Sequence, residues 1–194
     1  AYENNINASF EANATLIVTY QGNYSGMSHS AFTIKRVIVV VTPDAGQSKV
    51  FGEADPVPLT YTVAGMVDGE TPAFTGALSR QAGEAVRAYS ITQGTLALAD
   101  NGAFLATNYI MEFYIYATFA ITAKDVSALT IADITAVTYN GAAHTPEPEV
   151  KDGDDVLEEG TDYMLSYTAN TNAGTNTATV TVTGKGNYGG TRDK

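Results

Sequence analysis

The feature that most constrains the fold of this sequence is the alternation of apolar and hydroxyl-bearing side chains along short runs. In 177–183, Ala178, Val180 and Val182 alternate with four threonines. A period of two is typical of a β-strand with one buried side and one solvent-facing side. Asn-Gly, Asp-Gly and Gly-Gly pairs, which favour turns, separate such runs. The pattern predicts an all-β fold of small sandwiches. Further runs of this kind lie at 15–20, 59–63, 89–91, 109–113 and 119–121.

The window with the strongest helical pattern is 78–88, and it leaves a second fold open. Gly83 lies in its middle and disfavours a helix by about 1 kcal/mol relative to alanine. The first interpretation is therefore a turn within tandem small Ig-like β-sandwich repeats. The alternative is a set of β-grasp-like units in which 78–88 supplies a short helix across the sheet.

The sequence also contains an internal repeat, marked by three Asn-Tyr pairs. Asn23-Tyr24, Asn108-Tyr109 and Asn187-Tyr188 each follow alternating residues, and the first two precede predicted closing strands such as 31–36. The same offset after the third pair places its closing strand beyond residue 194. This spacing predicts the last strands of one unit in 1–36, a complete unit in 37–122 and a unit lacking its closing strand in 123–194.

A sandwich that lacks an edge strand exposes an apolar slot and unpaired backbone groups, which another strand can occupy. One hypothesis is that the N-terminal strand of one molecule fills the C-terminal unit of the next, giving an open filament by strand exchange. The alternative is that the ends fall at arbitrary points of a longer, fairly stiff array. The residues expected to exchange are Ala31, Phe32, Thr33, Ile34 and Lys35.

Charge and composition exclude several classes of function. The chain has 21 acidic and 10 basic residues, for a net charge of −11, which argues against a nucleic-acid partner. No apolar run is long enough for a membrane span. The absence of cysteine excludes disulfides and thiolate chemistry. His29 and His144 have no metal-binding spacing, and no catalytic serine motif occurs. We therefore expect a protein that is not an enzyme.

An acidic stretch at 147–162 offers a candidate calcium site. Asp152, Asp154 and Asp155 could present carboxylates from one tight turn, and Ca²⁺ prefers several oxygen ligands. The residues do not follow the order of an EF-hand loop. The other interpretation is a solvated hairpin, and apart from calcium we expect no cofactor.

Two further chemistries involve single side chains. Tyr114 and Tyr116 alternate in an aromatic-rich hairpin and could contact sugars or proteins from its outer side, although packing within the hairpin is the other interpretation. Cysteine-free surface modules can also form a lysine isopeptide cross-link, which needs a buried lysine beside an amide and a carboxylic acid. Lys35, on a predicted closing strand, is the lysine that the sequence suggests for this role.

The stretch 50–96 resembles the MBG-type repeat of bacterial surface proteins. That family has a Tyr-Gly, an Asp-Pro and a Tyr-Thr-Val-x-Gly in order, and here these positions hold Phe51-Gly52, Asp55-Pro56 and 61–65. Phe51 in place of tyrosine is a departure that does not affect the expected fold. The stretch 138–191 is similar to the YDG-type repeat that accompanies it, through Tyr139-Asn140-Gly141.

This resemblance implies a non-catalytic structural or adhesive module, a stalk or spacer of a secreted protein at the bacterial cell surface. The implied partners are neighbouring repeats or copies of the chain itself, and host or surface glycans and proteins. Two alternatives remain, namely the self-assembling filament and a carbohydrate- or protein-binding domain.

Overall fold

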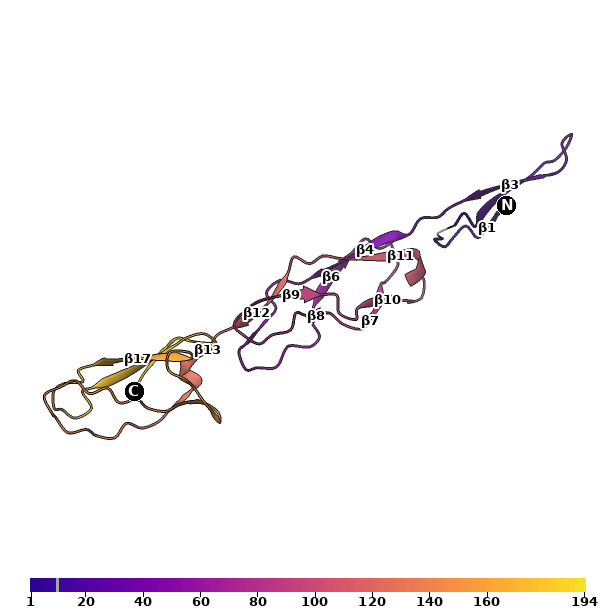
Figure 1. Cartoon of the computed structure of the whole chain (residues 1–194). Coiled ribbons are helices and arrows are strands. Elements are labelled where there is room, and N and C mark those ends of the chain that lie inside the picture. The colour runs from indigo at the N-terminus through magenta and orange to yellow at the C-terminus, as the bar shows by residue number, and fades with distance from the viewer. Residues whose placement is uncertain (10) are drawn as a thin grey trace. The chain divides into compact units, whose positions relative to one another are not determined.

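The structure is a computed structural model that describes residues 1–9 and 11–194, and it consists of β-strands joined by turns (Figure 1). In the described residues, helical geometry is confined to two single 3₁₀ turns, η1 (Ala106–Asn108) and η2 (Val126–Ala128). The all-β prediction is therefore confirmed.

The alternative with a helix over 78–88 is wrong. This window instead contains β8 (Ser79–Arg80) and the start of β9 (Arg87–Thr92). Gly83 has a φ of +140°, which a helix does not allow, and a Cβ at this position would lie 2.5 Å from the ring of Tyr89. The glycine thus brings the backbone against an aromatic ring rather than continuing a helix.

The chain divides into two compact units. Unit 1 comprises Ala1–Gln47, Val57–Gln81 and Ser90–Phe119. Unit 2 comprises Ser48–Pro56, Ala82–Tyr89 and Ala120–Lys194. The boundary falls inside two strands, β9 and β12 (Thr118–Thr122). Each unit is described separately below.

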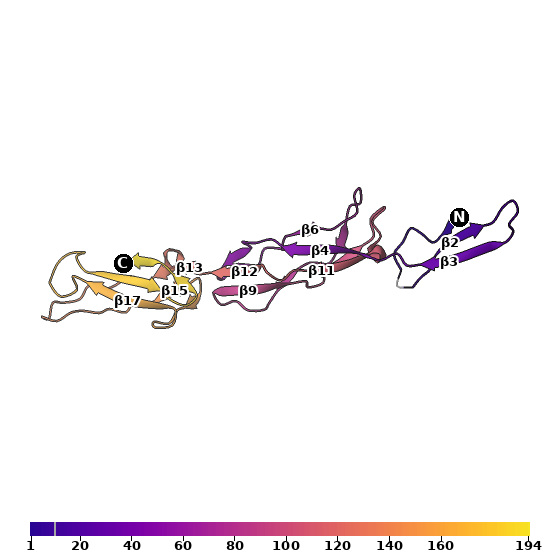
Figure 2. The ribbon, with the colours of Figure 1, turned by 90° about the horizontal axis from the view of Figure 1, so that it is seen from above.

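The N-terminal part of unit 1 is an antiparallel sheet of three strands. Its order is β1 (Tyr2–Glu3), β2 (Ala14–Thr19) and β3 (Met27–Phe32), and Figure 2 shows β2 beside β3. All six residues of β3 are exposed. The strand was expected at 31–36. In the structure it is β3, which begins earlier and ends at Phe32. Beyond it, the carbonyl of Ile34 accepts a hydrogen bond from the Ser9 N–H, 3.0 Å, instead of extending the ladder.

The rest of unit 1 is built around β4 (Val37–Pro43). This strand pairs in parallel with β11 (Tyr109–Phe113) and antiparallel with β6 (Tyr61–Ala64). A smaller antiparallel pair joins β7 (Ala73–Thr75) to β10 (Ala97–Ala99). Apolar side chains from these strands and from the adjoining loops meet in one core, formed by Val39, Phe104 and Tyr109 with Val63, Met66, Phe74 and Leu98 packed against them.

A four-stranded sheet has the order β5-β12-β9-β8, where β5 is Ser48–Val50. Strands β5 and β12 are parallel, with Ala120 opposite Ser48 and Ile121 opposite Lys49. The Phe51 N–H continues this pairing by donating to the Thr122 carbonyl at 2.9 Å. Lys49 consequently lies at the middle of an edge strand whose backbone pairs with β12.

Unit 2 contains three further sheets. They are β13 (Lys124–Asp125) with β19 (Tyr188–Gly189), β14 (Thr130–Ile131) with β15 (Val150–Asp152) and β16 (Asp155–Val156), and β17 (Tyr163–Thr168) with β18 (Thr179–Gly184) and β20 (Thr191–Asp193). The alternation predicted over 177–183 is confirmed at Val180 and Val182, which are buried, whereas Ala178 precedes β18 and is exposed. The core consists of Val126, Leu129, Ile131, Val150, Leu157, Tyr163, Val182 and Tyr188.

Candidate functional site

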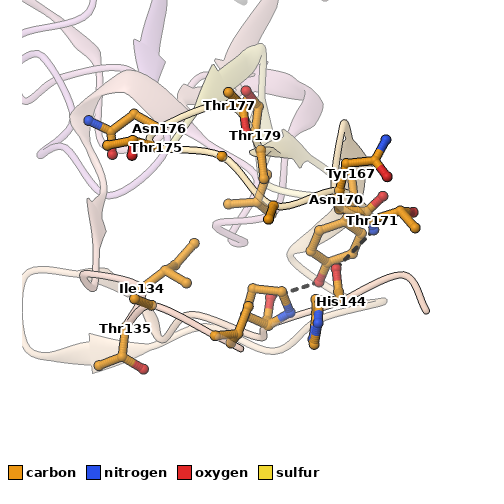
Figure 3. A pocket seen from close by; sticks show the side chains of 18 of the residues that line it. Ile134, Thr135, His144, Tyr167, Asn170, Thr171, Thr175, Asn176, Thr177 and Thr179 are labelled. Atoms are coloured by element: carbon orange, nitrogen blue, oxygen red, sulfur yellow. Dashed lines mark hydrogen bonds between the residues drawn. The ribbon is translucent and has the colours of Figure 1, made fainter. Parts of the chain in front are cut away.

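A pocket of about 650 Å³ lies in unit 2, between the strandless segment 133–146 and the residues that connect β17 to β18 (Figure 3). Hydrogen bonds fix one end of it. The Tyr167 hydroxyl donates to the Pro146 carbonyl at 2.8 Å, and the Asn170 side-chain amide donates to the His144 carbonyl at 2.8 Å. The His144 N–H returns a bond to the Asn170 carbonyl at 2.9 Å.

The lining of this pocket is mixed polar and apolar. Figure 3 shows Ile134 and Thr135 on one side and Thr175, Thr177 and Thr179 on the opposite side. Hydroxyl and amide groups share the lining with a somewhat larger apolar surface, so the pocket offers both hydrogen bonds and apolar contact. Its charged lining residues, Asp133 and Lys194, form an ion pair with each other at 2.7 Å.

The histidine of this pocket, His144, is partly buried. The Nε2 atom of His144 is buried and has no hydrogen-bond partner among the residues that the structure describes. His29, by contrast, is an exposed residue of β3. Nothing in the sequence around His144 distinguishes it, because its burial depends on the bonds between 144 and 170.

The predicted exchange residues lie at the end of the N-terminal sheet of unit 1. Ala31 and Phe32 belong to β3, paired with β2, while Thr33, Ile34 and Lys35 follow the strand. Lys35 is exposed. Isopeptide chemistry needs a buried lysine, so the choice of Lys35 for that cross-link is wrong.

The two tyrosines proposed for ligand contact lie at the surface of unit 1. Tyr114 is 44% exposed and Tyr116 is 84% exposed, and their ring centroids are 5.7 Å apart. They follow the end of β11, and the Tyr114 N–H donates to the Val41 carbonyl at 3.0 Å. The pair thus forms an aromatic surface attached to a buried strand.

The acidic turn is the β15–β16 hairpin, and its three aspartates do not converge. Asp152 forms an ion pair with Lys124 and accepts a hydrogen bond from the Tyr188 hydroxyl at 3.3 Å. Asp154 and Asp155 are exposed. Within residues 1–9 and 11–194, no group of three or more acidic or histidine side chains is placed to hold a metal ion. Calcium binding here stays a prediction from the sequence.

A buried ionic cluster in unit 2 was not foreseen from the sequence. Lys49 is only 8% exposed, and its Nζ lies 2.7 Å from Asp55 Oδ1 and in contact with Glu84 Oε2. Hydrogen bonds to Asp55 and then to Glu84 raise the pKa of Lys49 above its usual value, although burial opposes them. No local pattern could have revealed the cluster, because Glu84 comes from a distant segment of the chain.

Tyr109 and Tyr188 are both buried, and each directs its hydroxyl at a carboxylate. Tyr109 donates to Glu70, and Tyr188 donates to Asp152. Burial is the largest cause that raises the pKa of Tyr188 to about 12, followed by the negative charge of Asp152. Burial and Glu70 likewise raise the pKa of Tyr109. Both side chains are therefore structural neutral phenols.

These features define an all-β protein in which each of the two units has a hydrophobic core of its own. Residues 39–120 match the family model of the MBG domain (YGX type), which confirms the resemblance read from 50–96. The match lies inside the predicted unit 37–122. MBG domains form a non-catalytic repeat family found in surface proteins.

The other comparisons give no further relatives. No curated protein matches the chain, and no solved structure matches it. Residues 1–38 and 121–194 lie outside the family match, so the YDG-type resemblance of 138–191 stays a prediction. Among the described residues, no helix has the length and apolar character needed to cross a membrane.

Proposed function

We propose that this chain is a non-catalytic spacer module of a stalk on a secreted bacterial surface protein. The observation that carries the proposal is the match of 39–120 to the MBG domain, a repeat domain of surface proteins. A stalk positions a binding partner away from the envelope and has to resist pulling. A stalk therefore needs a well-packed β-unit, and it does not need a catalytic group.

The strand pairing of unit 1 supports a load-bearing role. Strand β4 opens the matched segment, β11 lies near its end, and the two pair in parallel from Val37 opposite Tyr109 to Val41 opposite Phe113. A pull on the N-terminal end of β4 and the C-terminal end of β11 shears a parallel ladder. All of its hydrogen bonds then share the load, whereas pulling two strands apart from one end breaks them in succession.

Single-molecule pulling between introduced cysteines tests this proposal, because the chain has no cysteine of its own. Lys35→Cys with Ile115→Cys loads the ladder in shear, and both positions are exposed. Lys35→Cys with Thr107→Cys loads the same ladder from one end, and Thr107 is also exposed. We expect a clearly higher rupture force in the first variant. Equal forces would argue against a load-bearing module.

A second candidate function is adhesion through the aromatic surface of unit 1. The tilted pair Tyr114 and Tyr116, with Ile115 between them 70% exposed, presents apolar surface of the kind that contacts sugar rings or protein side chains. Host or surface glycans and proteins are the proposed partners. A glycan and protein array with wild type and the Tyr114→Ala variant tests it. Equal signals from both proteins would refute this role.

A third candidate is the filament formed by strand exchange. The pocket of unit 2 supports it, because segment 133–146 has no strand of its own along one wall, and the exposed β3 could supply a strand from a second copy. We expect assembly that increases with concentration and that decreases in the Phe32→Asp variant. A protein that stays monomeric at high concentration, and that deletion of 1–36 leaves unchanged, would exclude the filament.

A further inference from the structure

The cluster of Lys49, Asp55 and Glu84 is assembled from three segments of unit 2. Lys49 is the central residue of β5, Asp55 lies in the loop that follows this strand, and Glu84 lies in the segment before β9. The Lys49 side chain is 5% exposed, against 36% for Asp55 and 61% for Glu84. The amine is thus buried, while both acids keep a path to solvent.

The cluster places one buried ammonium group in contact with two carboxylates. Moving charges out of water is unfavourable even when they are paired. A reaction that converts the ammonium and one carboxylate into a neutral amide removes one positive and one negative charge from the site.

We propose that Lys49 and Asp55 form an intramolecular isopeptide bond, with Glu84 carrying the proton. The Nζ atom lies 2.7 Å from Asp55 Oδ1, so it also lies beside the carboxyl carbon bonded to that oxygen. Holding an amine and a carboxyl group in contact makes their condensation effectively unimolecular. This proposal is independent of the stalk function and would stand if that function failed.

The step balances without any added reactant. Lys49 first passes one proton to Asp55 along their hydrogen bond, which leaves a neutral amine and a neutral carboxylic acid. The nitrogen lone pair attacks the Asp55 carbonyl carbon, and the Glu84 carboxylate accepts the second proton from nitrogen. Glu84 then protonates the departing hydroxyl, which leaves as water, and the Nζ–Cγ amide remains. Lys49 is an ammonium before the reaction, in agreement with its raised pKa. The two protons that it loses each have an acceptor in contact, namely Asp55 for the first and Glu84 for the second.

The surroundings hold the reacting groups in place. The Lys49 carbonyl accepts a hydrogen bond from the Thr122 hydroxyl at 3.1 Å, which adds to the β5–β12 pairing. On the other side, the Tyr89 hydroxyl donates to the Ala85 carbonyl at 2.8 Å, one residue beyond Glu84. The Val86 N–H donates to Asn187 Oδ1 at 2.9 Å. The two residues that follow Glu84 are therefore both held by hydrogen bonds.

Unit 2 also contains an internal comparison for the chemistry. Lys124 forms an ion pair with Asp152, with 28% and 18% of the two side chains exposed. In the described part of the chain, Lys124 contacts a single carboxylate, and the other group at Asp152 is the Tyr188 hydroxyl. A neutral phenol does not accept the proton from an attacking amine. We therefore expect a cross-link at Lys49 and none at Lys124.

Intact-mass measurement of the denatured full chain tests the proposal without depending on any variant. We expect a mass lower by one water molecule than the sequence requires. Trypsin should fail to cut after Lys49 and should release 37–80 as one peptide with the same loss, because an amide-bonded lysine is not a trypsin site. A mass equal to that of the plain chain would overturn the proposal. So would a water loss located at Asp152-Gly153, where a succinimide can form.

Two variants separate the roles of the acids. Asp55→Ala removes the acceptor, and Glu84→Gln removes the proton carrier while keeping the side-chain shape. In both we expect the full mass, and we expect trypsin to produce the separate peptides 37–49 and 50–80. A cross-link that persists in Asp55→Ala, or a loss of ammonia that joins Lys49 to residue 84 in Glu84→Gln, would overturn the assignment of Asp55 as acceptor. Circular dichroism of each variant checks that it has folded.

Discussion

The Asn-Tyr pairs of the two units use their asparagines in the same way. Asn108 Oδ1 accepts the Ala8 N–H at 2.8 Å in unit 1, and Asn187 Oδ1 accepts the Val86 N–H at 2.9 Å in unit 2. The donors lie 100 and 101 residues earlier in the chain. In both units, therefore, the asparagine ties the start of a late strand to a much earlier segment by one side-chain bond.

The tyrosines of these pairs occupy equivalent strand positions but different cores. Tyr109 lies opposite Val37 and Tyr188 lies opposite Lys124, each in a parallel pair. Tyr109 stacks on Phe104, with centroids 4.5 Å apart and planes at 20°. Tyr188 instead meets Phe51 edge-on, at 5.6 Å and 76°. The repeat thus preserves the backbone pairing and the buried phenol, while each unit packs that ring with its own neighbours.

The largest expected effect comes from removing either ring. Tyr109→Ala should lower the free energy of unfolding of unit 1 by about 3–5 kcal/mol, and Tyr188→Ala should do the same for unit 2, as for other large buried aromatic residues. Urea unfolding followed by amide exchange in each unit measures the loss. A loss confined to one of the two variants would show that the second tyrosine is not equivalent.

The next effect concerns pH. Because burial and Asp152 raise the pKa of Tyr188 from 10.0 to about 12, the folded state prefers the neutral phenol. The stability from this preference is fully present below pH 10 and is lost as the pH rises toward 12, on the order of 2–3 kcal/mol. We expect Tyr188→Phe to flatten the stability profile of unit 2 over this window. Urea midpoints measured from pH 8 to 12 would contradict this if both proteins lost stability equally.

The sequence predicted the fold class because alternation reports local geometry. Val180 and Val182 were expected on a buried face, and both are buried. The burial of Lys49 could not be predicted in this way. A lysine in a short strand is ordinary by pattern, and only the approach of Glu84, 35 residues later, makes it the centre of a cluster. The same holds for the pocket of unit 2, whose shape depends on the bonds between His144 and Asn170.

The asparagine bonds are expected to contribute less than the tyrosine rings. Asn187→Ala and Asn108→Ala should each lower the free energy of unfolding by about 1–2 kcal/mol, because a partly buried backbone N–H loses its acceptor. Amide exchange at Val86 and Ala8 reports the loss directly and should accelerate only in the matching variant. Asn172→Ala, at an exposed position, is the matched control and should leave both amides unchanged.

The smallest effect is expected at Asn23-Tyr24, the Asn-Tyr pair that the comparison has left out so far. Tyr24 is 76% exposed and lies outside any strand, between β2 and β3, so its ring contributes little to a core. Tyr24→Ala should change the free energy of unfolding by no more than about 0.5 kcal/mol, as surface substitutions usually do. Urea unfolding beside Tyr109→Ala makes the contrast. A loss at Tyr24 comparable with that at Tyr109 would mean that the ring is buried in solution, for example by strand exchange with a second copy. The three Asn-Tyr pairs would then be energetically equivalent in spite of their different exposure.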